Sequence, residues 1–341
     1  MNDDSDLIVG IDNGGTKNNV TVLRGAGEFL IDHLIELPSR VTEGTEAALD
    51  ALVAAFHHGL EVAAVDRSQV RAIGLDTPGP ASAGGVLSSK GATNFVLPEW
   101  NGFDIRGAFE ARIGLPVIYL NDGNAAAMYA HHAHFGMSAG HRSSISAIVG
   151  TGLGGGVVEQ GDVIRGASGM AGELGHLHIP MDNILEPDQP VPQCNCGFRG
   201  DVESVASLTG IRLNLLPYWL SRYPDHPLAS LPIADAAKEL RGYAVDGDEM
   251  ARKVFSQQAV ALANLFTISA RFTDPHAYFV GGGVVEASAE FRDWFMGEIR
   301  SHVRLMAEQR DVVEIALVPD LDMAGARGVA VAARNEMGLR G

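Results

Sequence analysis

The feature that most limits what this chain can fold into is a pattern that occurs twice. The segment IVGIDNGGTKNNV begins at Ile8, and the segment IVGTGLGGGVV begins at Ile148. Each has two short apolar runs with a glycine-rich break between them, which is the pattern of two buried strands joined by a loop. The repetition predicts an internal duplication, in which two related domains each contribute a glycine hairpin to one cleft.

The rest of the chain continues each half with alternating strand-like and helix-like segments. At 341 residues the chain is long enough for about two domains, at roughly 150 residues per domain. After the first hairpin we expect a strand over 29–35, a helix over 46–60, strands over 70–77 and 117–120, and an Ala-rich helix beginning near Asn124. After the second we expect a mostly helical insertion over 205–248, a helix over 251–272, strands over 277–280 and 312–318, and a helix over 325–337. The alternation predicts an α/β fold.

Charge and composition narrow the range of partners. The chain has 42 Asp and Glu against 25 Lys and Arg, which gives a net charge of −17, and no run of basic residues occurs in it. We expect no nucleic-acid partner, because such a chain repels a polyanion. Residues 1–6 are acidic and polar, and no stretch approaches the roughly 18 apolar residues that span a bilayer. The sequence therefore predicts a cytoplasmic protein without a membrane partner.

The glycine-rich loops are candidate phosphate sites, because backbone amides approach phosphate oxygens closely where no side chain intervenes. They contain Gly14 and Gly15, Gly150 and Gly152, and Gly281–Gly283. One such loop alone more often indicates only a tight hairpin, whereas three at corresponding places favour phosphate binding. The sequence GIDNGGTK is not a Walker loop, since Thr precedes Lys and a strand follows, and the loop at Gly150 does not open a helix as a Rossmann loop does.

Residues beside the first loop suit the same chemistry. Asp12 ends the first predicted strand, and its carboxylate could hold a hydrated magnesium ion. Thr16 and Lys17 can donate hydrogen bonds to phosphate. A plain turn aspartate is the alternative reading of Asp12.

Five motifs carry a resemblance to a known family. DNGGTK at Asp12, NDGNAAA at Asn121, GTGLGGG at Gly150, AGELGH at Ala171 and CNCGFRGDVES at Cys194 occur in this order. Together they resemble the ROK family (repressors, open reading frames, kinases), and in particular its sugar kinases that are similar to bacterial glucokinase. The resemblance runs from about residue 7 to 335.

The resemblance implies an actin-like ATPase fold, related to ribonuclease H, with two related domains around a nucleotide cleft. It places a smaller N-terminal domain at 1–120 plus 325–341 and a larger C-terminal domain at 121–324. ATP with Mg²⁺ would bind in the cleft, the sugar would bind at the hinge, and the chain would form a homodimer.

Residue roles also follow from the resemblance. Asp122 is expected to be the catalytic base, with a helix N-cap as its alternative role. The expected sugar ligands are Asn94, Asn121, Glu173, His176 and Glu203. The expected nucleotide-binding residues are Asp12, Gly14, Gly15, Thr16, Lys17, Gly150, Thr151, Gly152, Gly281, Gly282 and Gly283.

The family usually holds one zinc ion with a His and three Cys, and this chain departs from that pattern. His176, Cys194 and Cys196 match three ligands, but Asp201 stands where the third Cys is expected, and the segment after His176 is longer than usual. Two thiolates, an imidazole and a carboxylate can still form a tetrahedral zinc site. The alternative is a pair of reduced loop thiols, since residues this close do not form an unstrained disulfide.

The implied activity is ATP-dependent phosphorylation of the 6-hydroxyl of a hexose, with glucose as the first choice. Mannose, fructose, allose, N-acetylglucosamine and N-acetylmannosamine differ from it by one epimer or one substituent, so motif spacing does not separate them. Whether the phosphoryl donor is ATP or polyphosphate is also left open by the sequence. Within the insertion, the part around Leu215 to Pro227 could form a lid, a dimer contact or a specificity element. A non-catalytic sugar-binding regulator is the alternative class, although regulators of this family carry a helix-turn-helix segment before the first hairpin and only six residues precede Leu7 here.

Overall fold

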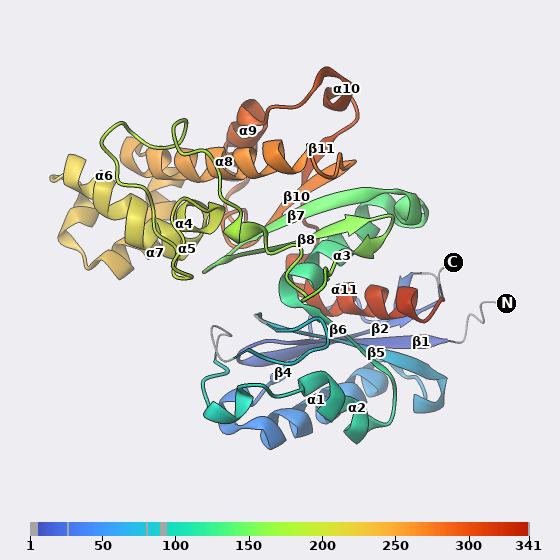
Figure 1. Cartoon of the computed structure of the whole chain (residues 1–341). Coiled ribbons are helices and arrows are strands. Elements are labelled where there is room, and N and C mark those ends of the chain that lie inside the picture. Colours follow the sequence, from blue (N-terminus) through green and yellow to red (C-terminus); the bar gives the residue numbers. More distant parts are fainter. Residues whose placement is uncertain (1–5, 26, 80, 89–93, 340–341) are drawn as a thin grey trace. The chain divides into compact units, whose positions relative to one another are not determined.

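The computed structural model describes residues 6–25, 27–79, 81–88 and 94–339 (Figure 1). Its contacts divide the chain into two compact units. Unit 1 comprises residues up to Ser146, Gly156–Gly172 and those from Val318 onward, and unit 2 comprises Ala147–Gly155 and Glu173–Leu317. Among the helices that the structure describes, none is long and apolar enough to cross a bilayer.

The first sheet has the order β3-β2-β1-β5-β6, and β4 also pairs with β2. Strands β1 and β2 form the antiparallel glycine hairpin, whereas β1, β5 and β6 are parallel neighbours. The bounds of these strands are β1 Leu7–Asn13, β2 Lys17–Arg24, β3 Glu28–Phe29, β4 Glu36–Pro38, β5 Val70–Thr77 and β6 Val117–Asn121.

The second sheet has the order β11-β10-β7-β8-β9. In both sheets the first three strands lie in the order third, second, first. Two later strands continue the sheet beside the first one, β5 and β6 in the first sheet and β10 and β11 in the second, so the repeat seen in the sequence is a repeat of topology. The bounds are β7 Ser143–Val149, β8 Leu153–Glu159, β9 Asp162–Val163, β10 Ala277–Gly281 and β11 Glu314–Leu317. The predicted α/β fold with a duplicated hairpin is confirmed.

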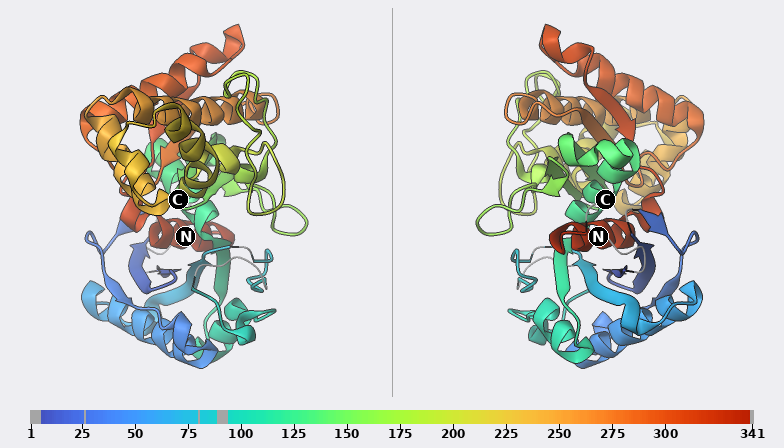
Figure 2. Two further views of the ribbon diagram at one scale, coloured as in Figure 1. Left: turned by 90° about the vertical axis from the view of Figure 1, so that its left-hand side faces the viewer. Right: turned by 90° about the vertical axis from the view of Figure 1, so that its right-hand side faces the viewer.

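Helices cover both faces of the first sheet (Figures 1 and 2). Helices α1 (Thr45–Ala63) and α2 (Ile105–Ile113) cover one face, and α3 (Asp122–Phe135) and α11 (Leu321–Glu336) cover the other. The alternation along β1 matches these two layers: Leu7, Val9 and Ile11 join the core under α1, while Ile8 joins the core under α11.

Unit 2 is rich in helices. Its long helix α8 (Glu249–Ser269) is buried along most of its length, and α9 (Ala289–His302) packs on it. The insertion over 205–248 is mostly helical, as the sequence predicts. The remaining helices of unit 2 are α4 Val202–Ala206, α5 Leu208–Gly210, the π-helix η6 Ile211–Leu215, α6 Leu216–Arg222, α7 Ile233–Val245 and α10 Ala307–Arg310. Short 3-10 helices connect the elements of both units: η1 Val41–Glu43, η2 Arg67–Gln69, η3 Pro98–Trp100, η4 Gly136–His141, η5 Leu174–His176 and η7 Pro227–Ser230.

Two local predictions differ from the structure. The strand expected over 29–35 is reduced to β3, which ends at Phe29, and the next strand begins only at Glu36. The segment IDHL between them has no regular structure, because Asp32 and His33 interrupt the apolar pattern and face solvent. The Ala-rich helix begins at Asp122, two residues before the expected start. The domain boundaries at residues 120 and 324 stay a prediction.

Helix α11 lies directly on the backbone of the first sheet. A Cβ atom at Gly10 would overlap the carbonyl oxygen of Ala326, and one at Gly74 would overlap that of Val329. On the other side of the helix, a Cβ at Gly328 would overlap the carbonyl oxygen of Ala125 in α3. These glycines are needed for the close approach of backbones rather than for unusual dihedral angles.

We predict that Gly328→Ala destabilises the protein by about 1–3 kcal/mol, since the added methyl group has no room between α11 and α3. The matched control is Gly297→Ala in α9, where a Cβ would meet no atom within 4 Å. That substitution should stabilise by about 0.5–1 kcal/mol, because Ala favours a helix over Gly. Urea denaturation of both variants measures the difference, and equal effects would contradict the packing argument.

Candidate active site

The first glycine hairpin is a tight turn between β1 and β2. The Gly14 amide donates to the carbonyl oxygen of Lys17 at 2.9 Å, and the Lys17 ammonium is paired with Glu36 at 2.5 Å. Asn94 donates its side-chain amide to the carbonyl oxygen of Gly15 at 3.0 Å. Thr16 and Lys17 are exposed. The loop thus presents two donors to solvent, and Asn94 contacts the loop itself.

Carboxylates gather where the parallel strands of the first sheet end. Asp12 on β1 is the register partner of Asp76 on β5, and Asp122 follows the next strand, β6. Burial raises the pKa of Asp76 well above its ordinary value, and the charges of Asp12 and then Asp122 raise this pKa further. Burial also raises the pKa of Asp12, although the hydrogen bond to Asp76 lowers it. Bringing these carboxylates together is unfavourable unless a proton or a cation joins them.

Asp76 is a residue that sequence reasoning missed. The segment VRAIGLDTPGP ends in Asp76 as the segment LIVGID ends in Asp12. This similarity between the two segments is the sequence signal that could have identified Asp76, since the ends of adjacent parallel strands meet at one edge of a sheet.

Asp122 is the first residue of α3 and is exposed. The N-cap is Asn121, whose side chain accepts a hydrogen bond from the Asn124 amide at 2.8 Å, so the alternative role of Asp122 as the cap is wrong. The Asp122 carboxylate accepts from the adjacent Gly123 amide at 2.7 Å. The cap fixes the start of the helix, and Asp122 is the exposed residue of its first turn.

The second glycine loop joins β7 to β8 in unit 2. The Gly150 amide donates to the Gly152 carbonyl oxygen at 2.9 Å. The amides of Leu208 and Thr209, at the start of α5, donate to the carbonyl oxygens of Gly150 at 3.0 Å and Thr151 at 3.1 Å. The start of α5 therefore holds this loop through main-chain contacts.

Glu203 on α4 holds the same loop from another side. One carboxylate oxygen accepts from the Leu153 amide at 2.9 Å, and the other accepts from the Cys194 thiol at 3.3 Å. A Cβ at Gly152 would lie 2.8 Å from the first of these oxygens, so a side chain there would displace the carboxylate. Glu203 thus joins the glycine loop to the cysteine loop.

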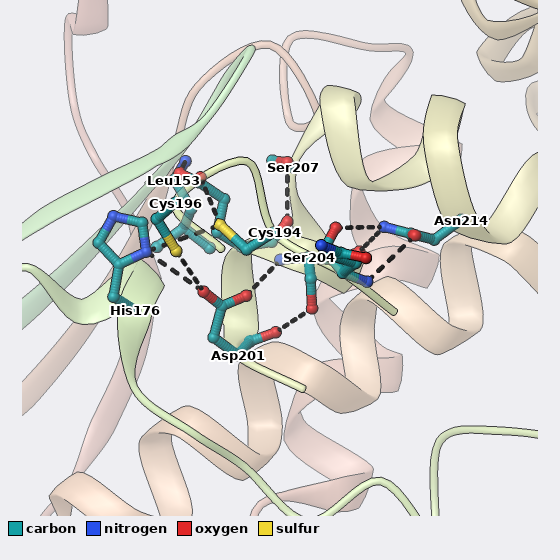
Figure 3. A network of polar contacts seen from close by, with 10 residues as sticks. Leu153, His176, Cys194, Cys196, Asp201, Ser204, Ser207 and Asn214 are labelled. Atoms are coloured by element: carbon teal, nitrogen blue, oxygen red, sulfur yellow. Dashed lines mark hydrogen bonds and ion pairs between the residues drawn. The ribbon is translucent and has the colours of Figure 1, made fainter. Parts of the chain in front are cut away.

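Four potential metal ligands converge beside Glu203: one ligand atom from each of His176, Cys194, Cys196 and Asp201 lies within 4.8 Å of the others. His176 Nδ1 lies 3.2 Å from Asp201 Oδ2, and Cys196 Sγ lies 3.6 Å from the same oxygen (Figure 3). The other Asp201 oxygen accepts from the Ser204 amide at 2.8 Å and caps α4. Burial is the main cause that raises the pKa of the Cys194 thiol, and a bound cation would offset it.

These four residues fit a zinc ion by their chemistry. Two sulfurs, one imidazole nitrogen and one carboxylate oxygen make a tetrahedral donor set. Both cysteines are free, in agreement with the prediction that they form no disulfide. Glu173 precedes η5, and its side chain is partly buried.

The third glycine loop follows β10. Gly282 has a φ of 93°, and a Cβ there would overlap the carbonyl oxygen of Val149 at the end of β7. The Gly283 carbonyl oxygen accepts a hydrogen bond from Arg241 on α7. Beside this loop, α7 and residues 286–288 line an open cavity of about 600 Å³.

The sequence is similar to one protein family and to sugar kinases of two kinds. The model of the ROK family matches residues 8–336. A glucokinase from Streptomyces coelicolor is 31% identical over 293 residues, which cover 82% of either chain. An N-acetylmannosamine kinase from Yersinia pestis is 28% identical over 275 residues, covering 80% of this chain and 82% of the relative.

Solved structures resemble the fold as a whole. The ROK hexokinase from Thermus thermophilus has a TM-score of 0.76 and 30% identity, with 97% of this chain and 99% of the other covered. A ROK glucokinase from Streptomyces griseus, solved with glucose and AMPPNP, has a TM-score of 0.67 and 29% identity, with 96% and 99% covered. With its duplicated hairpins, its strand-end carboxylates and this match over nearly the whole sequence, the chain belongs to the ROK family and has the actin-like ATPase fold.

Proposed function

We propose that this protein is an ATP-dependent kinase that phosphorylates the 6-hydroxyl of a hexose, with glucose as the first candidate. The observation that carries the proposal is the Asp122 carboxylate. It is exposed on the first turn of α3, and Asn121 rather than Asp122 caps this helix. A sugar hydroxyl needs a proton acceptor when it attacks a phosphoryl group, and a carboxylate meets that need.

The three glycine loops support a nucleotide as the donor. Gly14, Gly15, Gly150 and Gly152 lie in turns that follow the first strand of each repeat, where backbone amides can bind phosphate oxygens. The cavity beside Gly281–Gly283 has room for an adenosine group, and Tyr243 and Arg241 are among its lining residues. The bound AMPPNP of the S. griseus relative is consistent with this assignment.

Asp12 is our candidate for the magnesium site. Carboxylate oxygen is the ligand that Mg²⁺ prefers, and Asp12 lies next to the first glycine loop. The ion supplies neutralising charge to the phosphates during transfer. Thr16 and Lys17, which are exposed on the same hairpin, add donors for those phosphates.

We assign sugar recognition to Asn94, Asn121, Glu173, His176 and Glu203. Such side chains discriminate among sugars because a hydroxyl that is missing or inverted leaves a buried polar group without a partner. Glucokinases and an N-acetylmannosamine kinase have similar identity to this chain, so other hexoses and N-acetylhexosamines are the second candidates. A homodimer and a cytoplasmic location stay part of the proposal.

We also propose that His176, Cys194, Cys196 and Asp201 hold one zinc ion. The proposal rests on the convergence of their ligand atoms and on the dual role of Asp201, which caps α4 with the oxygen that does not face the cluster. The ion would fix the cysteine loop beside Glu203, and no part of the transfer reaction depends on it directly.

Asp122→Asn should lower kcat by about a hundredfold to ten-thousandfold, because it removes the proton acceptor without changing the shape of the side chain. Hexose affinity should be retained. The measurement is ADP release with Mg²⁺ and ATP across a panel of hexoses and N-acetylhexosamines, together with calorimetric sugar binding.

The matched control is Glu46→Gln, an exposed carboxylate in the first turn of α1. It should turn over like the wild type. Near-normal turnover of Asp122→Asn would disprove the role of the base. A wild type that is inactive on every sugar, with polyphosphate also tested as the donor, would favour a sugar-binding protein instead.

We predict about one zinc ion per purified chain, measured by elemental analysis. Asp201→Asn should weaken zinc affinity at least about tenfold, since it removes a charged ligand while Asn still caps α4. Asp201→Cys should restore tight binding, because a thiolate is a good zinc ligand. Asp188→Asn, at an exposed ion pair, is the control. Zinc-free wild type that is insensitive to chelators would identify the cysteines as plain reduced thiols.

A further inference from the structure

Asp76 is left without a role by the proposed function, although it lies among the groups that would carry it out. Its side chain is fully buried at the end of β5. Neither of its carboxylate oxygens has a hydrogen-bond partner of ordinary geometry among the described residues. The polar group that reaches it is the carboxyl group of Asp12, and two carboxyl groups can share a hydrogen bond only when one of them is protonated.

The fold directs both side chains to the same place. Gly10 and Gly74 are register partners on β1 and β5, and both lie under the backbone of α11. Asp12 and Asp76 come two residues later on the same strands, so their side chains project from that same face of the sheet. The Asp12 carboxylate lies against Gly325 of α11, where a Cβ would come within 2.9 Å of it. The two carboxylates thus share a niche between the strand ends and the start of α11.

This niche contains negative charge without a compensating cation from the chain. No ion pair among the described residues involves Asp12 or Asp76. Asp12 is only partly buried, whereas Asp76 is buried behind it. Buried carboxylates are normally paired or bound to metal, since an uncompensated buried charge is strongly unfavourable. A small divalent cation, which prefers oxygen ligands, satisfies this requirement.

We propose that Asp76 is the inner carboxylate of the divalent-cation site whose outer carboxylate is Asp12. This inference rests on the proposed function, because it concerns the Mg²⁺ that accompanies the nucleotide. Asp76 adds a second negative charge to the site and lies on the side away from solvent, while Asp12 faces the side from which the ion enters. The pair therefore retains the cation at the strand ends, close to the helix that begins with Asp122.

The test is a titration of the full-length, zinc-loaded protein with Mn²⁺, followed by electron paramagnetic resonance, in the absence of nucleotide. Prior loading with zinc keeps Mn²⁺ away from the cysteine cluster. We expect the wild type to bind one Mn²⁺ and Asp76→Asn to bind it at least about tenfold more weakly. Asp50→Asn removes one exposed charge from α1 and should bind Mn²⁺ as the wild type does. The same comparison with ADP present should give the same ranking.

The outcomes are distinct. Unchanged Mn²⁺ affinity in Asp76→Asn would overturn the inference, as would a wild type that binds no Mn²⁺ and leaves the carboxyl pair with only a shared proton. Circular dichroism reports whether the variant folds, and a wild type that binds no Mn²⁺ overturns the inference even if it does not. Turnover on the sugar panel is measured separately. A protein that is inactive on every sugar but still binds Mn²⁺ through Asp76 would refute the kinase proposal and support the cation site.

Discussion

The contact between helix α11 and the backbone of β1 and β5 is the constraint on which the first unit depends. Gly10 and Gly74 allow the helix to lie directly on the strands, and Gly328 allows α3 to lie on the other side of it. A C-terminal segment is thereby packed against the N-terminal sheet. The same close approach leaves the ends of β1 and β5 next to the start of α11, where Asp12 meets Gly325. The position of the carboxylates is a consequence of this packing.

In the second unit, Glu203 is the residue that connects two loops of the site. Its two carboxylate oxygens accept from Leu153, beside the glycine loop, and from Cys194, in the cysteine loop. Gly175 adds a further constraint, since a Cβ there would overlap the carbonyl oxygen of Leu153. A side chain that the family resemblance assigns to the sugar therefore also holds the loop that we assign to phosphate. Glu203 therefore connects the cysteine cluster directly to that loop.

Much of the architecture could be predicted from the sequence because it depends on local pattern. The two hairpins have alternating apolar runs around glycine, and both appear with the same strand order in the two sheets. The convergence of His176, Cys194, Cys196 and Asp201 also follows from a motif whose ligands are close in the chain, apart from His176. The prediction of a strand over 29–35 was wrong. Exposed polar residues interrupt the apolar residues of this segment, and no neighbouring strand continues to pair with it.

The sequence by itself determined the repeat, the α/β class, the glycine loops and the family, since each is written in spacing along the chain. Only the tertiary structure decided which polar groups meet. It made Asn121 rather than Asp122 the helix cap, gave Glu203 two partners, and placed Asp76 behind Asp12 with no partner other than that carboxyl group among the described residues. For Asp12 and Asp76 the physical reason is that strand register and the packing of α11 bring together residues more than 60 positions apart, and periodicity within one segment contains no information about the register between two.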